Sequence, residues 1–203
     1  MSKHVRQVIH VRPNDNINRM IVATSIKPVL DGHCLYVISS FIDEGSRQAL
    51  CEEALQGPSR RTCLGGQACE WWTEYGVRPE GRLSQALTGT YAYSLLKAAD
   101  GLNRWQPQMW VHHYANGERI PWHRDAAGDL QLVLCLLAPP AVNGGLFLLR
   151  PGSRTVSVDL RPGDAVIFKA TKILHSTTRL RPTAELPKPE RMVAVARFYK
   201  AME

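Results

Sequence analysis

The stretch from Met109 to Asp125 reads MWVHHYANGERIPWHRD and ends in His123-Arg124-Asp125. In an extended segment, residues two apart point to the same side, so the side chains of His123 and Asp125 can reach one metal ion. A second histidine, His175, follows in the run Ile173-Leu174-His175. Two imidazoles and one carboxylate can occupy one face of an octahedron and leave positions open, an arrangement that suits Fe(II). The stretch therefore predicts an open iron site.

The sequence around this stretch predicts a β-rich half. Runs rich in β-branched and aromatic residues are separated by turn sequences such as Asn116-Gly117 and Pro162-Gly163. Several short strands at this spacing are typical of a sandwich or barrel. The predicted strands are 108–115, 130–137, 145–149, 155–159, 165–169, 175–180 and 191–199.

The residues before this half predict helices and a few strands. Strands are expected over 18–30 and 33–42, and Asp43 can cap a helix over 44–56. Residues 58–82 are interpreted as irregular. Ser84 is expected to cap a second helix over 85–99. The apolar stripe of that helix would be Leu83, Leu87, Tyr91, Leu95 and Ala98. The pattern indicates an α+β fold with helices packed outside a β core.

The order of the motifs resembles the 2-oxoglutarate/Fe(II) dioxygenase family, in particular its prolyl-4-hydroxylase-like branch. The resemblance covers about residues 108–199. The matching pieces are Tyr114, Gly117, His123-Arg124-Asp125, Gly144-Gly145-Leu146, Pro162-Gly163-Asp164-Ala165-Val166-Ile167-Phe168, His175 and Arg191. It implies a double-stranded β-helix, a distorted jelly roll, with N-terminal helices outside. We expect one domain over 1–203, with α/β support in 1–107 and a catalytic β-helix in 108–203.

The resemblance also implies the cofactors. Fe(II) would be bound by His123, Asp125 and His175, and O2 would react beside it. The cosubstrate 2-oxoglutarate would be held at its far carboxylate by Arg191, with a hydroxyl from Tyr114. A guanidinium offers two parallel donors to a carboxylate. The segment between His175 and Arg191 is long for a hairpin, so Arg197 stays open as the alternative clamp.

Substrate contacts are expected near the iron ligands. Arg119, Trp122 and Arg124 surround the ligand pair and are candidate pocket edges. Strand alternation puts His112 on the same face as Tyr114, and Arg197 on the same face as Arg191. Both are candidate substrate contacts.

The implied reaction is hydroxylation of an unactivated C–H, with succinate and CO2 as co-products. The expected substrate is an amino acid, a related small polar metabolite or a peptidyl residue. One alternative is a nucleic-acid N-demethylase of the same superfamily, and another is a non-catalytic metal-binding β-barrel. The net charge of +7 could attract nucleic acid, but Lys and Arg are scattered along the chain. A small-molecule or peptide partner is therefore favoured, and the oligomeric state is not determined.

The location is expected to be cytoplasmic. The five cysteines are odd in number and scattered, which does not indicate a disulfide framework. No apolar run approaches the roughly 18 to 20 residues that cross a bilayer, so no membrane partner is expected. The first residues lack the apolar core of a signal peptide.

Overall fold

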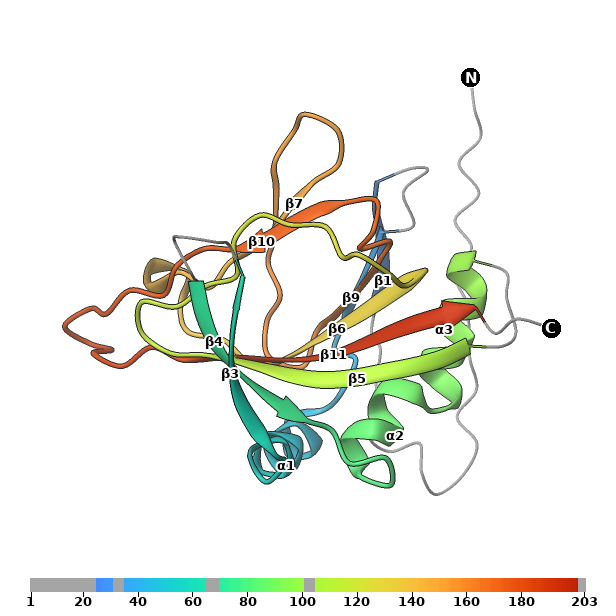
Figure 1. Cartoon of the computed structure of the whole chain (residues 1–203), viewed down its shortest axis with the longest axis horizontal. Helices are drawn as coiled ribbons and strands as arrows, with labels where there is room; N and C mark the ends of the chain where they lie inside the picture. Colours follow the sequence, from blue (N-terminus) through green and yellow to red (C-terminus); the bar gives the residue numbers. More distant parts are fainter. Residues whose placement is uncertain (1–24, 31–34, 65–69, 101–104, 201–203) are drawn as a thin grey trace.

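The computed structural model describes residues 25–30, 35–64, 70–100 and 105–200. An eight-stranded antiparallel sheet has the order β1-β2-β9-β6-β11-β5-β4-β3, and a smaller sheet has the order β10-β7-β8. In Figure 1 the small sheet lies above the large one and helices lie on the other side. The strands are β1 (Ser25–Leu30), β2 (Leu35–Ser39), β3 (Ser59–Leu64), β4 (Glu70–Gly76), β5 (Trp105–Tyr114), β6 (Leu130–Leu137), β7 (Phe147–Arg150), β8 (Val156–Val158), β9 (Ala165–Phe168), β10 (Leu174–Thr177) and β11 (Arg191–Lys200).

Strand alternation divides the core into two hydrophobic clusters. On β11, Met192, Ala194 and Phe198 belong to the cluster under the helices, whereas Val193 and Val195 belong to the cluster between the sheets. All five are almost fully buried. A central strand buried on both faces reads as a continuous apolar run, which is why RMVAVARFY shows little polar alternation. The charged residues of that run, Arg191 and Arg197, lie on the inner face of the sheet and reach the space between the two sheets.

The predicted first helix is confirmed as α1 (Glu44–Leu55), and the Asp43 carboxylate accepts from the Ser46 backbone N–H at 2.8 Å. The prediction of a single second helix over 85–99 was wrong, because the chain forms two helices there, α2 (Arg82–Thr88) and α3 (Thr90–Asp100). They separate at Gly89, whose ψ of 175° is extended.

The cap and the stripe predicted for that second helix also need correction. Ser84 is not the cap: it lies inside α2, whose N-cap is Gly81. The free N–H groups of Arg82 and Leu83 instead donate to the Glu53 carboxylate of α1, at 3.0 and 3.1 Å. Ala98 of the predicted stripe is exposed, whereas Leu83, Leu87 and Leu95 are buried. Cross-helix capping of this kind leaves no local signal in the sequence.

The strands predicted from residue 108 onward are confirmed, with ends shifted by a few residues. The prediction that residues 58–82 are irregular was wrong, because β3 and β4 form a hairpin there and β4 pairs with β5. Arg60 of β3 donates to Glu74 of β4 at 3.0 Å. Charged cross-strand pairs stabilise an exposed edge but hide the apolar alternation by which strands are recognised. Residues 18–24 of the first predicted strand lie outside the described residues.

The two halves of the chain share one sheet, since β1 to β4 flank strands of the C-terminal half. Strands β9, β6, β11 and β5 thus form the centre of the large sheet, and their inner face carries the side chains considered next. Among the described residues, no helix is long and apolar enough to cross a bilayer.

Candidate metal centre

The structure brings His123, Asp125 and His175 together although they come from two separate segments. The loop between β5 and β6 is fastened to β10 by backbone hydrogen bonds, among them His123 N to His175 O at 3.0 Å and His175 N to His123 O at 2.9 Å. The Asp125 N–H donates to the Ala170 carbonyl at 3.1 Å. One ligand atom of each residue lies within 4.8 Å of the others. The spacing fits three ligands of one ion.

Both imidazole rings are oriented by backbone carbonyls. His123 Nδ1 lies 2.9 Å from the Pro121 oxygen, and His175 Nδ1 lies 3.0 Å from the Ile173 oxygen. A carbonyl only accepts, so each Nδ1 carries the hydrogen and Nε2 keeps a lone pair. The Nε2 atoms lie 3.5 and 4.0 Å from Asp125 Oδ1. Outer hydrogen bonds that fix the ring and its tautomer are typical of metal ligands.

The electrostatics of the cluster also suit a divalent cation. Burial lowers the pKa of His175 to about 4, which keeps that ring neutral at physiological pH. Burial alone would raise the pKa of Asp125. The guanidinium of Arg197, whose Nη2 lies 2.9 Å from Asp125 Oδ2, opposes the effect of burial and holds that pKa below its ordinary value. An ionised carboxylate beside neutral imidazoles is the donor set that Fe(II) accepts in open sites.

A buried, unpaired cation lies across the cavity from this cluster. Arg191, the first residue of β11, is 2% exposed, and its Nε and Nη2 have no hydrogen-bond partner among the described residues. It pairs in register with Tyr114 of β5. A buried guanidinium without an anion is costly, so the site is built for a ligand that brings one. A carboxylate fits the two free donors.

Tyr114 is prepared to donate to the same anion. The Trp110 indole N–H can only donate, and it lies 2.6 Å from His112 Nε2, so this nitrogen must accept. Glu74 Oε2 is 3.4 Å from the same nitrogen, which is too long for an ordinary hydrogen bond. His112 Nδ1 therefore carries the hydrogen and faces the Tyr114 oxygen at 3.1 Å. The Tyr114 O–H is then free to donate into the cavity, and burial raises its pKa, which keeps it protonated.

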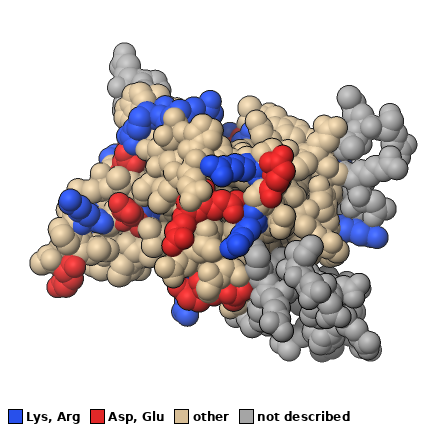
Figure 2. All heavy atoms as spheres, turned by 90° about the horizontal axis from the view of Figure 1, so that it is seen from below, with Lys and Arg blue, Asp and Glu red and all other residues tan. Residues whose placement is uncertain are grey.

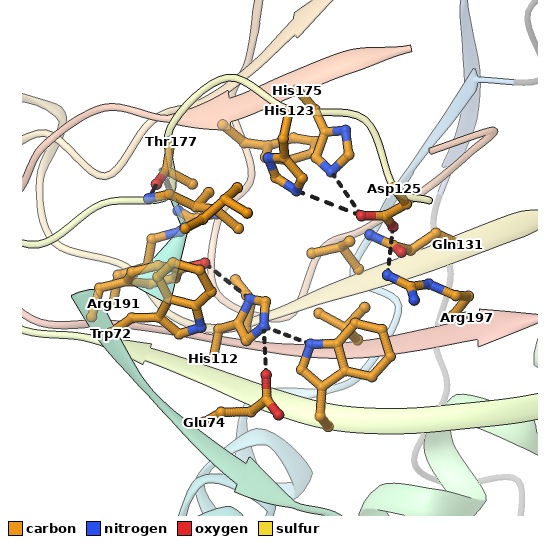
Figure 3. A pocket seen from close by; sticks show the side chains of 18 of the residues that line it. Trp72, Glu74, His112, His123, Asp125, Gln131, His175, Thr177, Arg191 and Arg197 are labelled. Carbon is orange, nitrogen blue, oxygen red and sulfur yellow. Dashed lines mark hydrogen bonds and ion pairs between the residues drawn. The ribbon is translucent and has the colours of Figure 1, made fainter. Parts of the chain in front are cut away.

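Figure 3 shows these groups around one cavity: the three candidate ligands on one side, Arg191 and Arg197 at opposite ends, and His112 between them. The volume is about 270 Å³. Arg197 forms an ion pair with Asp125 Oδ2 at 2.9 Å, and its guanidinium carbon lies 4.9 Å from the centre of the Trp110 ring. Of the two candidate clamps, Arg197 therefore has an anion already, and Arg191 has none in the described part of the chain.

The other predicted substrate contacts lie outside this cavity lining. Arg119 pairs with Glu70 at 2.9 Å, and the Trp122 ring lies 4.4 Å below the Arg150 guanidinium. Arg119 and Trp122 line a separate depression, and Arg124 is exposed. Substrate contact through these three residues stays a prediction.

Several lining residues were missed by the sequence reasoning. Gln131 and Thr177 point into the cavity, as does Trp72, which is 4% exposed and whose Nε1 finds no hydrogen-bond partner within the described segments. Alternation along LQLVLCLL places Gln131 on the same face as Val133, so this signal was present in the sequence. Trp72 gave no comparable signal because its strand was interpreted as irregular.

The comparisons with known proteins give a likeness in structure alone. No protein-family model matches the sequence, and no characterised protein matches it. A 2OG-Fe(II) oxygenase family oxidoreductase from Burkholderia pseudomallei is 12% identical with a TM-score of 0.67, over 83% of this chain and 86% of that one. A Pseudomonas putida prolyl-4-hydroxylase is 15% identical with a TM-score of 0.66, over 84% and 95%.

A third solved structure is the epimerase SnoN in complex with Fe3+, alpha ketoglutarate and nogalamycin RO. It is 16% identical with a TM-score of 0.62, over 81% of this chain and 79% of that one. At such identities the likeness establishes the fold. The α+β prediction with a jelly-roll core is thereby confirmed: this chain has the fold of these oxygenases.

Proposed function

We propose that this chain is an Fe(II)- and 2-oxoglutarate-dependent oxygenase of the prolyl-4-hydroxylase-like branch. It hydroxylates an unactivated C–H of an amino acid, a related small polar metabolite or a peptidyl residue. The observation that carries the proposal is one cavity that combines the His123–Asp125–His175 cluster with the unpaired Arg191. A metal-binding barrel without catalysis has no need of a buried cation that lacks an anion.

Each group of cavity residues has its own role in the proposed reaction. His123, Asp125 and His175 would hold the iron, while Arg191 and Tyr114 would hold the far carboxylate of 2-oxoglutarate. Iron, 2-oxoglutarate and O2 supply the oxidising chemistry: the substrate C–H becomes C–OH, and 2-oxoglutarate becomes succinate and CO2. Val133 and Val195 line the cavity and exclude water from the space between the two ends.

The partner is a small molecule or a peptide. Figure 2 shows Lys and Arg intermixed with Asp and Glu on the face that it presents, and the cavity itself is small. A nucleic-acid N-demethylase is the second candidate, because Arg197 follows Arg191 on the same strand face, as a second arginine does in that branch. The cytoplasmic location expected from the cysteine usage stays a prediction.

The test is succinate formation from 2-oxoglutarate with Fe(II), measured across amino acids, peptides and methylated oligonucleotides. Turnover that requires an amino acid or peptide supports the proposal. Asp125→Ala is the matched control, since it removes the carboxylate ligand and should abolish product. No turnover with any compound, together with unchanged metal affinity in His123→Ala, overturns the enzyme assignment. Formaldehyde release from an oligonucleotide would favour the demethylase.

A further inference from the structure

The inner face of the large sheet carries two rows that each contain an arginine, separated by the rows of Val193 and Val195. Arg191 pairs with Tyr114 in the first row. In the second row Arg197 pairs with Gln108 on one side and with Gln131 on the other. The strand rise places the Cα atoms of the two arginines about 20 Å apart. The first row is assigned to the cosubstrate in the function proposed above, which leaves the second row without a ligand.

Arg197 is held in place by three neighbours. Its Nη2 lies 2.9 Å from Asp125, and its guanidinium packs against the Trp110 ring. The loop after Asp125 closes on its stem, since a Cβ at Gly128 would lie 2.5 Å from Arg197 Cγ. Its Nε is buried and has no hydrogen-bond partner among the described residues. A guanidinium already fixed in one position loses little entropy when it binds a ligand.

Gln131 is the second feature without a partner. It is 5% exposed, lines the cavity, and its Oε1 has no hydrogen-bond partner in the described part of the chain. Figure 3 shows it beside Arg197 and Asp125. A side-chain amide can turn to present either its oxygen or its NH2 group. A buried amide atom without a hydrogen-bond partner costs free energy, and a bound polar group that hydrogen-bonds to it would recover that cost.

Charge decides which polar group fits. Asp125 is the counterion of one arginine, and Glu74 is paired with Arg60, so the lining keeps one surplus positive charge. Fe(II) and the 2-oxoglutarate dianion cancel one another, so the surplus persists when both are bound. An uncompensated charge in a cavity of this kind favours an anionic ligand. The group that enters the second row should therefore carry a single negative charge, as the carboxylate of a zwitterionic amino acid does.

We infer that Arg197, Gln131 and Gln108 form a substrate subsite for one carboxylate group, which selects small monocarboxylates such as free amino acids. The inference rests on the proposed function and narrows its substrate class. Two donors on adjacent strands match the two oxygens of a carboxylate. Gln108 is exposed at the outer end of the row, so the carboxylate enters from that end and the remainder of the substrate extends toward the metal ligands.

The experiment compares free L-amino acids with their primary amides, which differ mainly in the charged group. Binding is measured by calorimetry to protein loaded with Mn(II) and 2-oxoglutarate without oxygen, and to metal-free protein. At least one amino acid should bind wild type, and its amide should bind about tenfold or more weakly. Gln131→Leu should weaken the acid by about tenfold, and Gln131→Glu by about a hundredfold, with little change for the amide.

Mn(II) and 2-oxoglutarate affinities are measured for every variant, and Arg197→Lys, which keeps the charge, should retain part of the acid affinity. Equal binding of acid and amide, no binding of any acid, or a Gln131 variant that weakens 2-oxoglutarate in place of the acid overturns the subsite. Wild type that binds neither Mn(II) nor 2-oxoglutarate contradicts the proposed function, and the metal-free titration then decides on the subsite separately. Tighter binding of a phosphodiester oligonucleotide than of any acid also overturns it.

Discussion

Replacing Arg191 by Met should have opposite effects on the ligand-free protein and on cosubstrate binding. The guanidinium is 2% exposed and two of its nitrogens have no partner among the described residues. Removing an unpaired buried charge should raise the free energy of unfolding of the metal-free protein by about 1 to 4 kcal/mol. The same change deletes the two donors meant for 2-oxoglutarate.

The loss of binding can be sized from those donors. A hydrogen bond to a charged group contributes about 1.5 to 3 kcal/mol, so two are worth about 3 to 6 kcal/mol. The Kd for 2-oxoglutarate should therefore rise by about two to four powers of ten. Urea unfolding of the metal-free protein gives the first quantity, and calorimetry with Mn(II)-loaded protein gives the second.

Arg197→Met is the matched control. Its guanidinium has an anion in Asp125, so this variant should lose stability, because it leaves a buried carboxylate unpaired. A 2-oxoglutarate Kd within about threefold of wild type in Arg191→Met, or a less stable metal-free protein, would refute the reasoning. A larger loss of 2-oxoglutarate affinity in Arg197→Met would show that Arg197 is the clamp.

Three further outcomes are expected. Trp110→Phe removes the donor that fixes the His112 tautomer, so the KM for 2-oxoglutarate should rise about fivefold with unchanged Mn(II) affinity, and an unchanged KM would contradict the tautomer assignment. The free energy of unfolding of the metal-free protein should fall as the pH is lowered from 6.5 toward 4, by up to about 1.4 kcal/mol per pH unit. In this range His175 binds a proton in the unfolded chain, whereas the buried His175 of the folded protein stays neutral. Urea titrations at several pH values measure this slope, and His175→Gln should flatten it. Gly144→Ala should cost several times the roughly 1 kcal/mol of Gly117→Ala, since both glycines have positive φ but only a Cβ at Gly144 would overlap the Arg179 carbonyl oxygen, and equal losses in thermal unfolding would speak against it.

The sequence by itself determined the parts that depend on local periodicity and turn chemistry. Strand alternation put Trp110, His112 and Tyr114 on one inner face, and apolar runs with turn residues marked every strand of the C-terminal half. Asp43 was recognised as a cap because its partner lies three residues away. The two-residue spacing of His123 and Asp125 places both on the same side of an extended segment.

Only the tertiary structure decided the features that depend on a distant partner. The β3–β4 hairpin is held by the neighbouring β5, and α2 is capped by Glu53 of another helix. Arg191 and Arg197 are equivalent by alternation. They differ because the loop after β5 brings Asp125 to one of them, leaving the other with no anion in the described part of the chain. Local sequence records which face a side chain takes, whereas its charge partner is fixed by segments that meet only when the sheets close.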